Sequence, residues 1–143
     1  MKRVTKNEEE TFELAAELAK KAKGGEVYAL SGDLGAGKTV FVRGFCHGLG
    51  IKKGVSSPTF VLMKIYKVRG HKSIKEVCHI DAYRLKSAKD LEAIGALDYF
   101  GRKDAICFIE WPEAVKMEKE RAISIIIEQM KEDSRSIEIK RPV

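Results

Sequence analysis

Gly32-Asp33-Leu34-Gly35-Ala36-Gly37-Lys38-Thr39 is the stretch of this 143-residue chain that decides its predicted fold. It matches the phosphate-loop pattern G-x-x-x-x-G-K-[ST]: backbone N–H groups turn onto phosphate oxygens, the lysine reaches the β- and γ-phosphates, and the hydroxyl ligates Mg²⁺. Residues 26–30 before the loop read as a short buried strand, and residues 39–45 after it have the apolar spacing of a helix. Strand, glycine loop and helix is the order that such a loop requires. The stretch therefore predicts phosphate binding; the alternative is a glycine-rich turn that happens to precede a lysine.

Size and composition predict one domain covering residues 1–143, because the chain can bury one core and is too short for two ordinary ones. A hydrophobic fraction of 44% with 34% charged residues is typical of a soluble globular protein. No apolar run approaches the roughly 18 residues that a membrane span needs. The N-terminal residues turn acidic at Glu8-Glu9-Glu10 without an apolar core, so no secretory signal is predicted and the expected location is the cytoplasm, with no membrane partner.

The net charge leaves the class of ligand open, and the cysteine spacing gives no sign of a metal site. The net charge of +6 suits an anionic partner, either a nucleotide or a nucleic acid, but the scattered lysines fit a solvated basic surface equally well. Cys46, Cys78 and Cys107 have no C-x-x-C or Cys/His spacing. We therefore expect no zinc site and no disulfide framework, and three reduced, buried thiols.

Hydrophobic periodicity and turn residues place the other elements. The expected elements are a helix from the N-cap Asn7 to about residue 22, stopped by Gly24-Gly25; a helix over about 37–49; a hairpin of 61–68 with 74–80; a helix capped by Ser87, running to Tyr99 and broken by Gly101; a buried parallel strand over 105–109; and a closing hairpin of 121–128 with 135–140. This order predicts an α/β fold: one P-loop NTPase-like domain of three layers, with a mostly parallel central sheet plus antiparallel hairpins.

Two carboxylates at predicted strand ends are the candidate acids of the site. Phosphoryl transfer from ATP needs Mg²⁺ held by a hydroxyl and a carboxylate, together with a group that positions the attacking water. Thr39 supplies the hydroxyl, and either Asp81 or Glu110 could supply the carboxylate. Thr59 stands where a switch loop could reach the γ-phosphate, and Trp111 either stacks on a base or packs as a core aromatic.

Four motifs resemble one family together, over nearly the whole chain. They are Gly32 to Thr39, Ser57-Pro58-Thr59-Phe60, His79-Ile80-Asp81-Ala82-Tyr83-Arg84-Leu85, and Ile109-Glu110-Trp111-Pro112-Glu113. In this order and approximate spacing they are similar to those of the bacterial TsaE ATPases, formerly called YjeE, of threonylcarbamoyl-adenosine tRNA modification.

The resemblance implies a small phosphate-loop protein that binds and slowly hydrolyses ATP with Mg²⁺. It implies a role beside the TsaD and TsaB proteins, which install threonylcarbamoyl on adenosine 37 of tRNA, with any tRNA contact indirect. Carried over residue by residue, it makes Lys38, Asp81 and Glu110 catalytic, and Thr39, Asp81 and Glu110 the metal-side groups. The implied nucleotide contacts are Asp33, Leu34, Gly35, Ala36, Gly37, Lys38, Thr39, Thr59 and Trp111, with Glu9, Thr11 and Arg135 on the adenine side.

Two other functions stay open. A small-molecule kinase shares the loop, although no arginine-rich lid segment is visible in the sequence. A non-catalytic adaptor would keep the loop and use ATP only to set its shape. A GTPase and an ABC-type ATPase are not favoured, because the chain has neither an N-K-x-D motif nor an L-S-G-G-Q motif.

Overall fold

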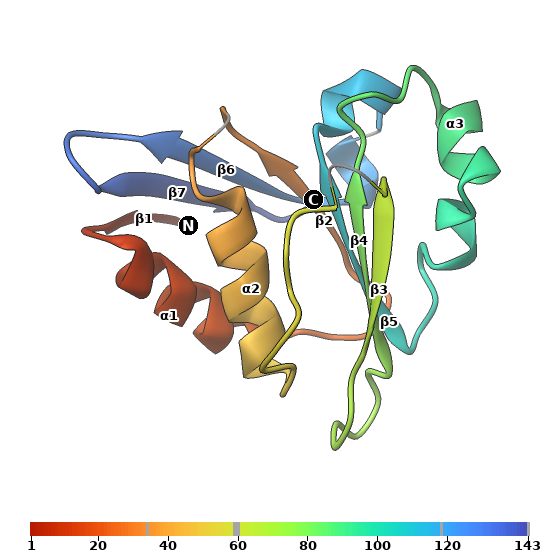
Figure 1. Cartoon of the computed structure of the whole chain (residues 1–143), viewed down its shortest axis with the longest axis horizontal. Coiled ribbons are helices and arrows are strands. Elements are labelled where there is room, and N and C mark those ends of the chain that lie inside the picture. Colours follow the sequence, from red (N-terminus) through yellow and green to blue (C-terminus); the bar gives the residue numbers. More distant parts are fainter. Residues whose placement is uncertain (34, 59–60, 118, 143) are drawn as a thin grey trace.

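A seven-stranded sheet forms the framework of the chain in the computed structural model, which describes residues 1–33, 35–58, 61–117 and 119–142. The strands lie in the order β1-β7-β6-β2-β5-β4-β3 (Figure 1). Their bounds are β1 Lys2–Thr5, β2 Val27–Ser31, β3 Met63–Lys67, β4 Glu76–Asp81, β5 Ala105–Glu110, β6 Ile123–Gln129 and β7 Arg135–Lys140. The helices are α1 Glu8–Ala19, α2 Lys38–Gly48 and α3 Ala88–Ala93, with 3₁₀ turns η1 Ala96–Asp98, η2 Pro112–Val115 and η3 Lys119–Arg121.

The centre of the sheet is parallel and its edges are antiparallel. β6, β2, β5 and β4 run parallel to one another, while β3 pairs antiparallel with β4, and β7 pairs antiparallel with both β6 and β1. The predicted parallel centre and both predicted hairpins are therefore confirmed. β1 was not predicted, because three of its four residues are exposed and show no apolar alternation; pairing with β7 holds this strand in place.

Each face of the sheet carries its own cluster of apolar residues, because successive side chains of a strand point to opposite faces. Tyr28 and Leu30 of β2 pack in the cluster that contains the apolar residues of α1 and α2. Val27 and Ala29 of the same strand pack in the other cluster, with residues of α3, η1 and η2. Helices on both faces of one sheet give the predicted three layers, and Figure 1 shows α1 and α2 together on one side and α3 on the other.

Close contact between α1 and α2 positions the N-terminus of α2. Gly44 and Gly48, one turn apart on α2, lie directly against the backbone of α1. A Cβ on Gly44 would come within 2.8 Å of the Phe12 Cα, and one on Gly48 within 2.7 Å of the Ala19 Cβ. Only residues without a side chain allow the two helices to approach this closely.

Two predicted helix ends differ from the structure. α1 begins at the predicted N-cap, where the Asn7 side chain accepts from the Glu10 N–H at 2.9 Å, but it ends at Ala19, before the two glycines. The helix after Ser87 ends at Ala93 and not at Tyr99, because Gly95 adopts a left-handed conformation (φ 84°) and stops it. Among the described residues, no helix has both the length and the apolar character needed to cross a membrane.

Candidate functional site

The glycine loop lies between the end of β2 and the start of α2, at the carboxyl edge of the parallel strands. Gly37 stands immediately before α2 at φ 106°, a left-handed conformation that favours glycine. The Ala36 N–H donates to the Asp33 carbonyl oxygen at 3.0 Å, which closes a turn within the loop. Open α/β sheets bind their ligands at this edge, so the predicted loop occupies the expected position.

Lys38, the first residue of α2, is almost fully buried. Its Nζ donates to the Gly32 carbonyl oxygen at 2.7 Å and lies 3.9 Å from the centroid of the Trp111 ring. Burial lowers the pKa of Lys38, while the nearby carboxylates of Glu110 and Asp81 act in the opposite direction. The ammonium group is therefore held at the loop by a carbonyl and an aromatic face.

Asp81 and Glu110 end two neighbouring parallel strands and are paired with each other in the register of β4 and β5. Both side chains are buried. Asp81 Oδ1 accepts from the Tyr83 N–H at 2.9 Å, and Glu110 Oε2 lies 2.7 Å from His79 Nε2. The two predicted acids therefore come together at one edge of the sheet, although 29 positions separate them in the sequence.

A cleft of about 230 Å³ joins the glycine loop to these two acids. It brings together five of the predicted site side chains with residues of α1 and of the 51–58 segment. Its lining is Glu8, Gly35, Gly37, Lys38, Thr39, Val40, Ser57, Asp81, Glu110 and Trp111.

Trp111 lines the cleft and contacts the lysine. Its backbone is left-handed (φ 57°), which is uncommon for a bulky residue. The exposed ring of Tyr83 packs against it with the ring centroids 5.1 Å apart. This tryptophan therefore contacts the site cation and lies outside both apolar clusters of the core.

Arg135 reaches the glycine loop from β7. Its Nε donates to the Ala36 carbonyl oxygen at 2.9 Å and its Nη2 to the Gly35 carbonyl oxygen at 3.4 Å. The side chain thus fastens the loop to the far hairpin of the sheet. Its predicted contact with adenine stays a prediction.

The remaining predicted nucleotide contacts are spread around the loop. Asp33 borders a neighbouring hollow with residues of β6. Thr11 is buried, with its hydroxyl 2.7 Å from that of Thr5, and Glu8 lines the cleft where Glu9 was predicted to make a contact. Leu34 and Thr59 lie outside the described residues.

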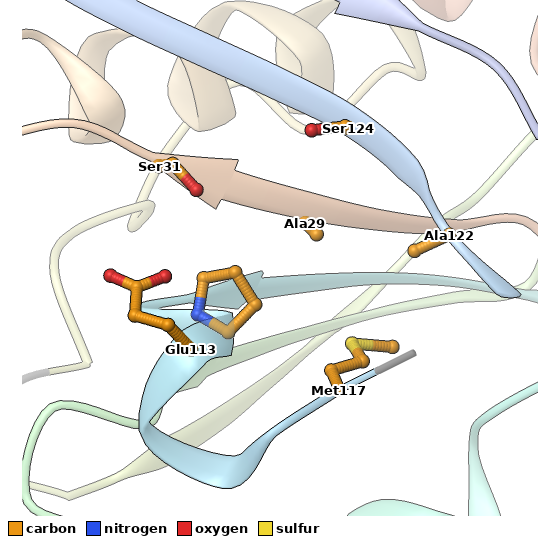
Figure 2. Close-up of a pocket in the computed structure, with 7 residues that line it drawn as sticks. Ala29, Ser31, Glu113, Met117, Ala122 and Ser124 are labelled. Atoms are coloured by element: carbon orange, nitrogen blue, oxygen red, sulfur yellow. The ribbon is translucent and has the colours of Figure 1, made fainter. Parts of the chain in front are cut away.

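A second hollow, of about 120 Å³, lies on the sheet face opposite α2. Figure 2 shows Ser31 and Glu113 towards one end of it and Met117 with Ala122 towards the other. Pro112 lines this hollow, and its neighbour Trp111 lines the main cleft. It was not predicted, because small residues on β2 and β6 give no sequence signal for a site.

His79 is the site residue that sequence reasoning left without a role. It is fully buried, and its ring reaches the Glu110 carboxylate. A signal was present: residues 79 and 81 share a strand and are two positions apart, so both point to the same face. Without the register of β4 against β5, however, the sequence does not show that Glu110 lies beside them.

Fold and site together define an α/β protein with a glycine loop at the carboxyl edge of its parallel strands. A family model described as threonylcarbamoyl adenosine biosynthesis protein TsaE matches residues 5–137, and the chain belongs to this family.

Individual relatives support the same assignment. The "tRNA threonylcarbamoyladenosine biosynthesis protein TsaE" of Bacillus subtilis is 37% identical over 134 residues, covering 93% of this chain and 80% of the relative. The protein of that name from Treponema pallidum is 34% identical over 141 residues, covering 97% and 99%. Among solved structures, the crystal structure of Bacillus subtilis YdiB superposes with a TM-score of 0.74 at 34% identity, covering 97% of this chain and 83% of that one. The predicted family and fold are thereby confirmed.

Proposed function

We propose that the chain binds ATP with Mg²⁺, hydrolyses it slowly, and serves threonylcarbamoyl-adenosine modification of tRNA beside the TsaD and TsaB proteins in the cytoplasm. Family membership supports the pathway. One observation carries the chemistry: Lys38, Thr39, Asp81 and Glu110 line the same cleft at the start of α2.

The oxygen donors of the cleft fit a magnesium ion that arrives with a nucleotide. Mg²⁺ keeps several waters and is held by one or two protein oxygens plus phosphate oxygens. Thr39 offers a hydroxyl, and Asp81 and Glu110 offer carboxylates. Among the described residues, no group of three or more His, Cys, Asp or Glu side chains could hold a metal ion without such help.

Binding requires Lys38 to exchange its partners. Its ammonium group donates to the Gly32 carbonyl oxygen and lies over the Trp111 ring. Phosphate oxygens offer a stronger, charge-assisted partner within the same loop. On this proposal Trp111 would lose its contact with the cation when the lysine turns to phosphate.

The charges that line the cleft support the proposal that hydrolysis is slow. An arginine directed at the transferred phosphoryl group speeds phosphoryl transfer by about 10³ to 10⁵. The described lining residues include lysine and carboxylates but no arginine, and Arg135 is engaged with loop carbonyls. The residues in place can orient a water and hold charge, so we expect a partner protein to stimulate the activity.

The test compares hydrolysis in matched variants. Glu110→Gln should keep ATP affinity within about threefold and lower kcat by about 10²-fold or more, because the carboxylate that accepts a proton from water is lost. Glu92→Gln, at an exposed position of α3 and outside the cleft lining, should hydrolyse ATP at the wild-type rate. Wild-type turnover by Glu110→Gln would overturn the role of Glu110.

Two further assays separate the open alternatives. ATP binding without turnover, even with TsaD and TsaB present, would replace the ATPase with an adaptor. Transfer of phosphate to a small metabolite would replace it with a kinase. Omitting this chain from a reconstituted tRNA modification reaction should stop turnover of the modifying complex, and unchanged multiple-turnover modification would remove the chain from the pathway.

A further inference from the structure

His79 is a polar residue placed in the interior of the sheet layer. It lies in β4, two residues before Asp81, with its ring fully buried. The ring is at a steep angle (76°) to that of Phe108 on the neighbouring strand, with centroids 6.4 Å apart. Its Nε2 lies 2.7 Å from Glu110 Oε2, and Nδ1 is the buried side-chain polar atom that lacks a hydrogen-bond partner among the described residues.

This pattern indicates that the hydrogen bond to Glu110 is the reason for a histidine at this buried position. An apolar side chain of similar size would fill the same space without the unpaired nitrogen, but it would leave Glu110 Oε2 without this partner. A neutral imidazole that donates from Nε2 leaves only a lone pair on Nδ1, a smaller penalty than an unpaired N–H. The single polar contact is with a carboxylate, and hydrogen bonds to an ionised acceptor are among the stronger ones.

Glu110 needs such a restraint because a cation lies nearby. Its carboxylate is the largest charge influence on Lys38, yet no ion pair within 4.0 Å forms between them in the described part of the chain. Glutamate has three rotatable side-chain bonds, and an unrestrained Glu110 could swing onto the lysine and block the phosphate position. With Oε2 bound to His79, the second oxygen is left for the cleft.

We propose that His79 is a positioning residue for Glu110, donating from Nε2 to Oε2 so that the carboxylate faces the cleft and stays off Lys38. This inference rests on the proposed ATPase function and adds a residue to its site.

Kinetics of matched variants test the proposal. The glutamine side chain of His79→Gln can place its amide nitrogen near the position of Nε2, whereas that of His79→Asn reaches only the position of Nδ1. We expect kcat for ATP hydrolysis to fall about tenfold or more in His79→Asn and His79→Leu, with ATP affinity within about threefold of wild type, and to recover substantially in His79→Gln. Equal losses in the glutamine and asparagine variants would overturn the proposal.

A double-mutant cycle separates positioning from general packing. If His79 acts through the carboxylate, His79→Asn should lower kcat no further once Glu110→Gln is present. Additive losses would show that the ring acts independently of Glu110 and would overturn the assigned role.

A spectroscopic readout does not depend on hydrolysis. Nitrogen NMR of the nucleotide-free protein, with the His79 signals assigned by their loss in His79→Gln, should show a proton on Nε2 and none on Nδ1. The opposite tautomer would overturn the proposal even if the protein proves to be an ATPase. The expected tautomer in a chain that never hydrolyses ATP would instead support the hydrogen bond while the proposed function fails.

Discussion

The charge on Lys38 costs the folded chain some stability, because the ammonium group is buried. Its ammonium group loses water on folding, and this burial lowers its pKa, while the carboxylates of Glu110 and Asp81 offset only part of the effect. A lysine whose pKa falls on folding binds its proton more tightly in the unfolded chain. Stability therefore rises with pH between the lowered value and the ordinary lysine value of about 10.4.

The corresponding prediction concerns the difference between wild type and Lys38→Met. Below the folded pKa of Lys38, the charged form costs stability and the difference in free energy of unfolding should be constant with pH. Above that pKa it should shift in favour of the wild type, because the neutral lysine no longer bears the desolvation cost. Urea unfolding of both proteins from pH 7 to pH 10.5 measures this difference. A difference that is flat across the alkaline range, or that falls, would contradict the desolvated lysine.

At the scale of elements, the glycine contacts between α1 and α2 determine where the glycine loop can lie. The loop is continuous with the start of α2, and α2 is seated against α1 through Gly44 and Gly48. The Glu8 side of the cleft also belongs to α1. Any change that separates the two helices must therefore move one wall of the cleft relative to the other.

Gly44→Ala should lower the free energy of unfolding by about 1–3 kcal/mol, because the new methyl group meets the α1 backbone and the helices cannot both keep their places. This loss should appear in spite of the roughly 0.5–1 kcal/mol that alanine normally adds to a helix interior. Chemical denaturation followed by circular dichroism gives the value. Arg43→Ala, on the exposed side of the same helix, is the control and should change stability by less than about 0.5 kcal/mol. A stabilised Gly44→Ala would show that the helices tolerate separation.

The elements also show what could be predicted from the sequence. Strong local signals succeeded: the Asn7 cap, the alternation in both hairpins, and the wholly apolar run of β5 each lie where predicted. β1 was missed because pairing with β7 holds it and its own sequence carries no strand pattern. The end of α3 was wrong because Gly95, nearer than Gly101, already stops the helix. Lys38 could be predicted from the loop pattern, and Asp81 and Glu110 from their places at strand ends; the structure brings all three to one cleft. The link from His79 to Glu110 required the strand register, which one sequence does not contain.

At the scale of the whole molecule, the three thiols report on global unfolding. Cys46 belongs to the apolar cluster under α2, whereas Cys78 and Cys107 belong to the cluster on the opposite face. All are buried and none is in a disulfide. Burial raises the pKa of Cys46 to about 12, and contact with Cys78 together with burial raises the pKa of Cys107.

We therefore expect no thiol to react with an aromatic disulfide reagent at pH 8 on the time scale of minutes, and all three to react in denaturant. The thiolate is the reactive form, and here it is both inaccessible and disfavoured. Colorimetric counting of released thiolate measures the outcome. Cys46→Ser serves as a control that should lower the denatured count by one. A thiol that reacts quickly in the native protein would reveal local opening on the face that carries it.

The hydrogen bonds from Arg135 to the glycine loop join a segment synthesised early to one synthesised late. The carbonyls it binds at Gly35 and Ala36 precede it by about one hundred residues, and β1 at the start of the chain pairs with the same late strand. A ribosome releases the glycine loop long before it releases β7. The loop therefore emerges without the side chain that fastens it, and a nascent chain that has not yet completed its last hairpin should hold nucleotide poorly. For the proposed nucleotide site, loading would follow synthesis of the final strand.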